Sequence, residues 1–368
     1  VWASVPPAGD GTPSSLPSRL STRRPRIDAL STGVGLLLSD SLRDPMLVLM
    51  ELCLTAVSTS QAGVVLRRQV LAAGISDDEI GRRVRAGAWV AIRRGAYVDR
   101  SAWLAMDDAA RHRAKVHAVV ANLACPVVVS HASAAVLLGL PAWGLDLSIV
   151  HVTRPPGVST RSEAGVQHHA AQLSDDQIIE LDGIAVTHPA RTVIDTARAT
   201  DFEPSVVVAD AALRAGLTTN GELLETVDVM RDWPGARNAG RVVEFSDGRA
   251  ESVGESRGRV CLYIGGLPRP DLQVLITGGP GDWTARVDFL FTEQRTIGEF
   301  DGRVKYGRPD QPRPDPGTVV WLEKLREDRL RAMGFEVVRF IWAELSRPDL
   351  VALKFRQAFA RASQRSLH

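Results

Sequence analysis

The chain has 368 residues, of which 45% are hydrophobic and 24% charged, a composition typical of folded globular proteins and not of disordered or collagen-like chains. At roughly 100–200 residues per domain, this length predicts two or three domains. The 44 Lys and Arg residues nearly balance the 43 Asp and Glu residues, and the resulting net charge of +1 argues against nucleic acid binding only if charge is spread evenly along the chain.

Residues 1–45 are rich in Pro, Ser and Gly, which predicts a disordered extension without the features of a secretory signal. Organised sequence begins near Met46 and Met50, so either is a candidate start of translation, and N-terminal peptide mapping of the native protein tests this hypothesis. The longest apolar run, 46–57, is too short to cross a membrane. The three cysteines form neither a disulfide framework nor a zinc pattern, and we therefore expect a cytoplasmic protein.

The segment 46–100 has the element order of a winged helix-turn-helix domain. Helices are predicted over 46–59, 66–74 and 76–87, the last two closed by glycine. Ser76 suits the N-cap of the third helix, and the acidic residues that follow it suit the helix dipole. A hairpin of alternating apolar residues comes next, and in this fold the helix after the turn enters the major groove of DNA.

Basic charge is concentrated in this domain, because residues 67–100 contain eight arginines and four acids. Arginine suits bidentate contacts with phosphates and base edges. The alternative is the solvated face of a winged helix that binds protein. The predicted DNA-binding residues are Arg67, Arg68, Arg82, Arg83, Arg85, Arg93 and Arg94.

The run GVVLRRQVLAAGISDDEIGRRVRAGAWVAIRRGAYV (63–98) resembles the N-terminal winged-helix domain of AbiEi-type antitoxins of type IV toxin–antitoxin systems. The resemblance implies operator binding and autoregulation, with a cognate toxin protein as a possible partner.

Residues 101–245 mix helix and strand, which predicts an α/β middle domain, and they resemble the second region of the same antitoxins. His131, His151, His168–His169 and His188 lack regular metal-ligand spacing, so we interpret them as structural or surface residues. This region has no recognisable set of catalytic residues, and we therefore expect it to be a scaffold or to bind a partner. Helices are predicted over 110–123, 130–140, 189–199, 206–217 and 219–227, and strands over 125–130, 147–155 and 183–188.

Two runs of alternating residues between 286 and 301 predict a second hairpin. If Phe291 pairs with Thr296, Asp288 lies directly opposite Glu299, with Cβ atoms about 4.5–5.5 Å apart. Like charges in that position destabilise a sheet unless a cation, a shared proton or an arginine lies between them.

A divalent metal explains the two carboxylates most sharply, because Mg²⁺ prefers oxygen ligands and can generate a hydroxide that attacks a phosphodiester. Lys305 follows closely and is suited to orienting the attacking water or neutralising the scissile phosphate. The alternative is a solvated hairpin whose acids pair with Arg286, Arg303 and Lys305.

Asp288, followed by the EFDG run 299–302, resembles the core of PD-(D/E)XK nucleases, specifically the Vsr-like branch of very-short-patch repair. AESVGESRGRV (250–260) resembles the first helix of that core, GLPRPDLQVLI (266–276) its intervening strand, and EKLREDRLRAMGFEVVRFIWAEL (323–345) the helix and strand after the active site. The domain implied covers residues 246–368.

The resemblance implies that Asp288 and Glu299 are metal ligands for Mg²⁺ or Mn²⁺. Glu255 takes the place of the first-helix acid, and Glu251 is the competing choice.

The motif departs from the family after Glu299, because Asp301 occupies the position of the basic residue and Lys305 lies four residues downstream. Asp301 is therefore a further candidate ligand. The histidine that often follows this run in the Vsr-like branch is absent, with Lys305 and Tyr306 in its place.

The helix before the last predicted strand has an apolar face. We interpret Glu323, Arg326, Glu327 and Arg329 as its solvated face, with Arg329 and Arg339 as weaker candidates for phosphate contact.

The sequence predicts a multidomain α/β (α+β) protein: an extension (1–45), a winged helix-turn-helix (46–100), an α/β middle (101–245) and a PD-(D/E)XK, restriction-endonuclease-like domain (246–368). The predicted function is Mg²⁺-dependent hydrolysis of DNA phosphodiesters. The alternatives are an antitoxin-type regulator with an inactive nuclease fold, and an interaction scaffold that does not touch DNA.

Overall fold

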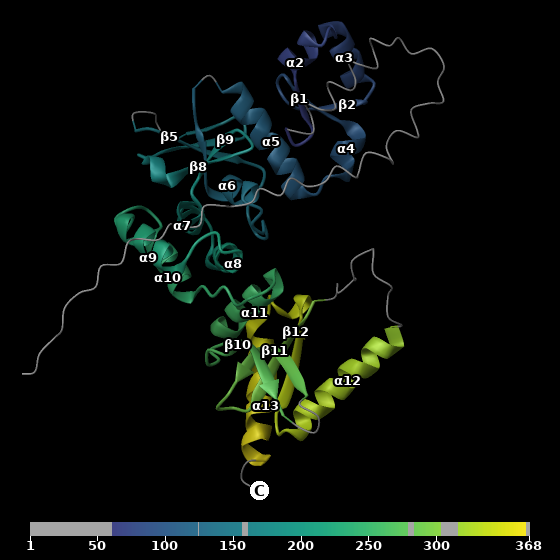
Figure 1. Cartoon of the computed structure of the whole chain (residues 1–368), viewed down its shortest axis with the longest axis vertical. Helices are drawn as coiled ribbons and strands as arrows, with labels where there is room; N and C mark the ends of the chain where they lie inside the picture. Colours follow the sequence, from purple (N-terminus) through teal and green to yellow (C-terminus); the bar gives the residue numbers. More distant parts are fainter. Residues whose placement is uncertain (1–60, 124, 157–160, 279–282, 303–315, 366–368) are drawn as a thin grey trace, which may run out of the picture. The chain divides into compact units, whose positions relative to one another are not determined.

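The computed structural model describes residues 61–123, 125–156, 161–278, 283–302 and 316–365. The predicted extension 1–45 and the predicted helix 46–59 lie outside these residues. The described residues form a mixed α/β protein whose strands belong to three separate sheets (Figure 1). Within these ranges, no helix is long and apolar enough to cross a membrane.

The first sheet has three antiparallel strands in the order β1-β3-β2, and two helices connect its first and second strands. Ser76 caps the second of these helices as predicted, since its hydroxyl accepts a hydrogen bond from the Glu79 backbone N–H at 3.3 Å. Gly95 closes the hairpin with a φ of +73°, a conformation that glycine adopts without strain. The bounds are β1 (Val64–Leu66), α2 (Arg67–Ala72), α3 (Asp77–Arg85), β2 (Trp89–Arg93) and β3 (Ala96–Asp99).

The second sheet has six strands in the order β6-β7-β5-β4-β9-β8. One apolar cluster lies between this sheet and α5 and α6, and a second lies among α6, α7, α8, α9 and α10. The strands are β4 (Val128–Val129), β5 (Val150–Arg154), β6 (Arg161–Glu163), β7 (Val166–Ala170), β8 (Ile178–Leu181) and β9 (Ile184–Thr187). The helices are α4 (Arg100–Ala105), α5 (Asp108–Asn122), α6 (His131–Leu137), η2 (Asp175–Gln177), α7 (Pro189–Ala199), α8 (Phe202–Arg214), α9 (Asn220–Val229) and α10 (Ala236–Phe245).

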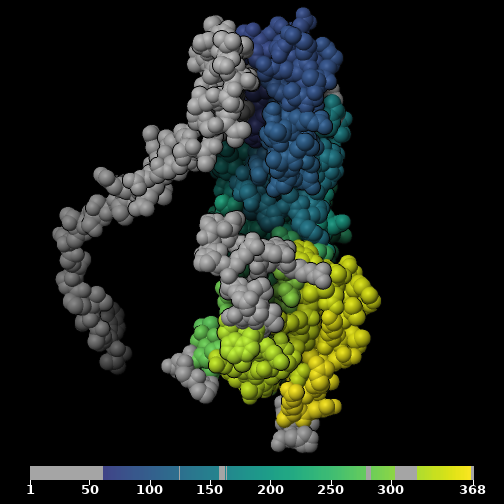
Figure 2. Space-filling view, turned by 90° about the vertical axis from the view of Figure 1, so that its right-hand side faces the viewer, coloured from purple at the N-terminus to yellow at the C-terminus, as the bar shows by residue number. Residues whose placement is uncertain are grey.

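The third sheet has four strands in the order β10-β11-β12-β13, and β12 and β13 run parallel because α12 connects them. Apolar residues of α11 and α13 pack on the strands in one cluster, and Leu330 of α12 packs on them in another. Side chains of α12 and α13 cover much of the visible surface of this region (Figure 2). The bounds are α11 (Val253–Ile264), β10 (Asp271–Thr277), β11 (Thr284–Phe291), β12 (Thr296–Asp301), α12 (Pro316–Ala332), β13 (Glu336–Ile341), η3 (Trp342–Glu344) and α13 (Pro348–Arg365).

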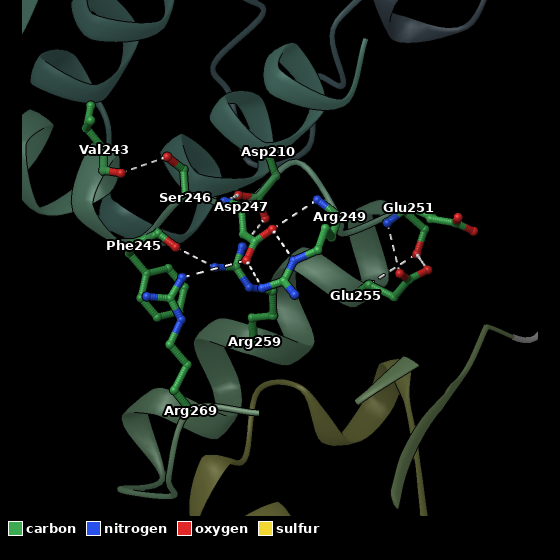
Figure 3. Close-up of polar contacts among 11 residues, drawn as sticks. Asp210, Val243, Phe245, Ser246, Asp247, Arg249, Glu251, Glu255, Arg259 and Arg269 are labelled. Carbon is green, nitrogen blue, oxygen red and sulfur yellow. Dashed lines mark hydrogen bonds and ion pairs between the residues drawn. The ribbon is translucent and has the colours of Figure 1, made fainter. Parts of the chain in front are cut away.

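Helix α11 is joined to α8 by a buried ion pair between Arg259 and Asp210 (Figure 3). The Arg259 guanidinium also donates to the Phe245 carbonyl, and the other oxygen of Asp210 accepts from the Asp247 backbone N–H at 2.7 Å. These contacts hold the start of the C-terminal region against the helices before it, so the position of α11 depends on buried polar groups as well as on apolar packing.

Candidate active site and nucleic-acid interface

Asp288 and Glu299 lie on neighbouring strands of the third sheet. The predicted pairing of Phe291 with Thr296 is confirmed. Continuing this register by three residues brings Asp288 opposite Glu299. The Asp288 carboxylate also accepts a hydrogen bond from the Phe300 backbone N–H at 2.9 Å, which fixes one of its oxygens at the surface of β12.

An arginine lies on the Glu299 carboxylate. The Arg326 guanidinium, from α12, donates to Oε1 at 2.8 Å and to Oε2 at 3.3 Å. The Glu299 side chain is only 14% exposed, and burial raises its pKa. Arg326 opposes that rise, and the negative charge of Asp288 adds to it. Facing carboxylates can be stabilised by a cation, a shared proton or an arginine. In this structure an arginine is present.

Arg326 belongs to a wider ion-pair network that joins α12 to β13. It also contacts Glu323 at 2.9 Å, while Arg339 of β13 bridges Glu323 and Glu327, the latter at 3.0 Å. The prediction of a solvated face on this helix is wrong for Glu323, Arg326 and Glu327, which are half-buried and pair with one another and with residues of the sheet. Arg329, by contrast, is exposed as predicted.

Glu255 is half-buried near the start of α11, and its carboxylate has three local donors. These are the Glu251 backbone N–H at 2.8 Å, the Ser252 hydroxyl at 2.8 Å and the Gln273 side-chain amide at 2.7 Å. Burial raises the pKa of Glu255, and the negative charge of Asp288 contributes to the rise. Glu255 therefore lies within electrostatic reach of the acids on the sheet.

Glu251 faces a different partner. Its carboxylate forms a two-point contact with Arg286 of β11, at 2.7 and 2.8 Å. The Glu251 and Glu255 side chains diverge from one another at the start of α11 (Figure 3). Of the two competing choices, Glu255 is the acid coupled to Asp288, and Glu251 neutralises Arg286.

A cleft of about 1070 Å³ opens over Asp288 and Glu299. The exposed Asp301 lies in its wall, whereas Lys305 and Arg303 lie outside the described residues. Carboxylate oxygens are the donors that Mg²⁺ and Mn²⁺ prefer, and arginines suit phosphate, so the cleft fits a cation together with a phosphate. The residues that line it are Arg286, Asp288, Glu299, Phe300, Asp301, Gly302, Glu323, Lys324, Arg326, Glu327, Asp328, Arg331 and Arg339.

The predicted DNA-binding arginines lie in α2, in α3 and in the β2–β3 hairpin, and they differ in their surroundings. Arg67 pairs with Asp77, and both Arg82 and Arg83 pair with Glu79. Two further side chains donate to backbone carbonyls, at 2.9 Å each: Arg68 to Ala121 and Arg93 to Ala164.

Arg85 and Arg94 are exposed, and neither forms an ion pair or hydrogen bond with another side chain or carbonyl in the described ranges. Arg85 ends α3, and Arg94 lies in the turn between β2 and β3. These two are the predicted residues with the greatest freedom to contact a phosphate backbone.

Three histidines that are far apart in the sequence lie close together in the middle region. Among the described residues, His131, His151 and His169 form the one group of His, Cys, Asp or Glu whose candidate ligand atoms all lie within 4.8 Å of one another. They come from the N-terminus of α6, from β5 and from β7. Their separation along the chain matches no metal motif, so only the strand pairing of β5 and β7 could have revealed the group.

No known family model matches the chain. It is 29% identical over 237 residues to two uncharacterized proteins of Mycobacterium tuberculosis, MT2308 of strain CDC 1551 / Oshkosh and Rv2248 of strain H37Rv. Each match covers 63% of this chain and 83% of the relative. Among solved structures, the RV2827C protein of M. tuberculosis aligns with 55% of this chain and 78% of its own, at 15% identity and a TM-score of 0.35.

Proposed function

We propose that the protein binds DNA and that its C-terminal region hydrolyses DNA phosphodiesters with Mg²⁺ or Mn²⁺. The observation that carries the proposal is the placement of Asp288 and Glu299 on neighbouring strands at the floor of a charged cleft, with the half-buried Glu255 coupled to Asp288. The order helix, three strands, helix and parallel strand supports a PD-(D/E)XK-like fold for residues 246–368.

In this proposal Asp288, Glu299 and Glu255 hold the metal ion, with Asp301 as a further ligand at the cleft edge. The bound ion supplies a nucleophilic hydroxide and stabilises charge on the phosphate. Lys305 assists the water. Arg326 then has two roles: it neutralises Glu299 before the cation binds, and it lies beside the cleft, where it can pair with a phosphate.

DNA binding is assigned to residues 61–99, which we propose form a winged helix-turn-helix. The three-stranded sheet and the turn between α2 and α3 support this assignment. The first turn of α3 carries Asp77, Asp78 and Glu79, which repel phosphate, so we assign the main contacts to Arg85 and to Arg94 in the wing.

A second candidate function is an antitoxin-type DNA-binding regulator whose nuclease-like region is inactive. Two contacts favour it: Arg326 already satisfies both oxygens of Glu299, and local donors already satisfy Glu255. A cognate toxin would then be the partner. We place the protein in the cytoplasm under either proposal.

Incubation of the purified protein with supercoiled, linear and mismatched DNA, in Mg²⁺ or in EDTA, separates these functions. The nuclease proposal predicts cleavage that depends on the divalent ion. DNA binding without cleavage supports the regulator instead. DNA affinity that does not fall with salt excludes both and leaves an interaction scaffold.

A further inference from the structure

We infer that His131, His151 and His169 form a binding site for a divalent transition-metal ion, with Zn²⁺ as the representative ion. Their candidate ligand atoms lie within 4.8 Å of one another. A tetrahedral ion with Zn–N bonds of about 2.0–2.1 Å holds its nitrogens roughly 3.4 Å apart. To coordinate one ion, the His131 ring has to rotate out of its stack on His169, so that the lone pairs of all three imidazoles point to the same position. The site is distinct from the carboxylates that we assign to Mg²⁺.

The rings of His131 and His169 are stacked, and those of His151 and His169 meet through a nitrogen of each. The centroids of His131 and His169 are 3.7 Å apart, and those of His151 and His169 are 5.2 Å apart. His151 Nδ1 and His169 Nε2 are 2.9 Å from one another, so these two nitrogens share one proton. A metal ion takes the position of that proton, and the proton moves to the other nitrogen of its ring.

The surroundings of His131 orient it as a metal ligand. Its Nδ1 lies 2.9 Å from the Ser130 hydroxyl, which in turn accepts a hydrogen bond from Thr153 at 2.8 Å. When Nδ1–H donates to Ser130, Nε2 keeps its lone pair for an ion. Metal-bound histidines usually donate their second N–H to an oxygen in this way. His131 also has a φ of +54°, unusual for a residue with a side chain, which is consistent with a constrained position.

The histidines are held in the neutral form that binds metals. Burial is the main cause, and it lowers the pKa of His151 to about 4 and that of His169 to about 3. His131 is 6% exposed, and its pKa is also lowered by burial. Imidazole nitrogen suits Zn²⁺ and the neighbouring transition metals, and not Mg²⁺.

The fourth coordination position is left to water or an anion. Asp195, the nearby acid, is 1% exposed, and its two oxygens are held by Arg191 at 2.7 Å and Arg198 at 2.9 Å. Its carboxylate is therefore already neutralised, and the two guanidiniums favour a negatively charged fourth ligand. Three histidines with one open position is an arrangement that catalytic zinc sites also use.

Zinc binding to the full-length protein tests this inference, with Zn²⁺ alone as the probe and a chromophoric chelator as competitor. We expect one tight site per chain. His151→Gln and His169→Gln should each lower Zn²⁺ affinity by more than about 100-fold, because losing an outer-shell partner alone costs about 10–100-fold. His188→Gln, at a half-buried histidine outside the group, should leave affinity unchanged. Equal affinity in the parent protein and the His151→Gln/His169→Gln double variant would overturn the inference.

His169→Cys provides a test in which signal is gained. Cysteine keeps a ligand at this position, so Co²⁺ should bind and show thiolate-to-cobalt charge-transfer absorption that the parent protein lacks. A variant with the parent's circular dichroism but without this absorption would count against the site.

Discussion

Arg326 of α12 holds both carboxylate oxygens of Glu299 of β12, at 2.8 and 3.3 Å. The two residues are 27 positions apart in the sequence, and their contact places the positive charge where the proposed metal ion would bind. The guanidinium and a divalent cation therefore compete for the same oxygens.

Removing Arg326 should strengthen metal binding. We expect Arg326→Gln to raise the affinity for Mn²⁺ by roughly 10-fold or more, because a hydrogen bond to a charged group contributes about 1.5–3 kcal/mol. Isothermal titration calorimetry measures the change. Arg329→Gln, on an exposed turn of the same helix, is the matched control and should bind Mn²⁺ as the parent does. Weaker Mn²⁺ binding by Arg326→Gln would show that the arginine does not occupy the metal position.

Gly254 sets the separation between α11 and the edge of the proposed site. A Cβ at this position would lie 1.9 Å from Cε1 of Phe300, the residue after Glu299. Gly254→Ala should lower the free energy of unfolding by about 1–3 kcal/mol or more, since overpacking forces a backbone shift. Urea denaturation measures it.

Gly221 is the control for this substitution, because it also occupies the second position of a helix. A Cβ there would meet only the Thr219 hydroxyl, at 3.8 Å. Gly221→Ala should be neutral or stabilising by up to about 1 kcal/mol. Similar effects of the two substitutions would contradict the packing described for Gly254.

The Asp210–Arg259 pair should contribute strongly to the attachment of α11. Asp210 is fully buried and Arg259 is 4% exposed. Asp210→Asn keeps the shape but leaves a buried, uncompensated guanidinium, so we expect a loss of about 3–5 kcal/mol of stability. Asp228→Asn, which breaks the exposed pair with Arg231, should cost less than about 1 kcal/mol. Thermal unfolding of both variants compares the two, and a small loss for Asp210→Asn would mean that the pair is not buried in solution.

Arg85 and Arg94 should carry the phosphate contacts of the proposed DNA-binding region. Arg94→Ala should weaken binding to all duplexes alike and reduce the slope of log affinity against log salt by about 0.9, the value for one phosphate contact. Fluorescence anisotropy at several salt concentrations measures the slope. Arg231→Ala removes an exposed arginine outside this region and should leave the slope unchanged. An unaltered slope for Arg94→Ala and Arg85→Ala would exclude this surface as the interface.

Local patterns in the sequence predicted much of the fold. Ser76 with its acidic first turn predicted the start of α3, and alternation around a polar turn predicted the pairing of Phe291 with Thr296. Strands β6 and β7 were not predicted, because RSEAGVQHHA (161–170) lacks an apolar alternation. His168 is nevertheless buried in β7.

The candidate site was predictable only where its residues are close in sequence. Asp288 and Glu299 belong to one hairpin, so the alternation of residues along its two strands was enough to predict that they lie opposite each other. Arg326 lies in a helix whose charged positions look like a solvent-exposed face in the sequence. Its partner Glu299 is on a strand that only the tertiary fold brings near, so the contact could not be predicted. His131 and His169 meet for the same reason, through packing of α6 on β5 and pairing of β5 with β7.

The rate of DNA cleavage in Mg²⁺ by the parent protein and by Asp288→Asn tests the central claim most directly. Glu293→Gln, an exposed acid in the turn of the same hairpin, is the matched control. We predict that Asp288→Asn lowers the rate by at least about 100-fold, because metal stabilisation of the transition state contributes several kcal/mol. DNA affinity and the rate of Glu293→Gln should stay at the parent's values. Cleavage by Asp288→Asn at the parent's rate, or no cleavage by the parent protein itself, would contradict the claim.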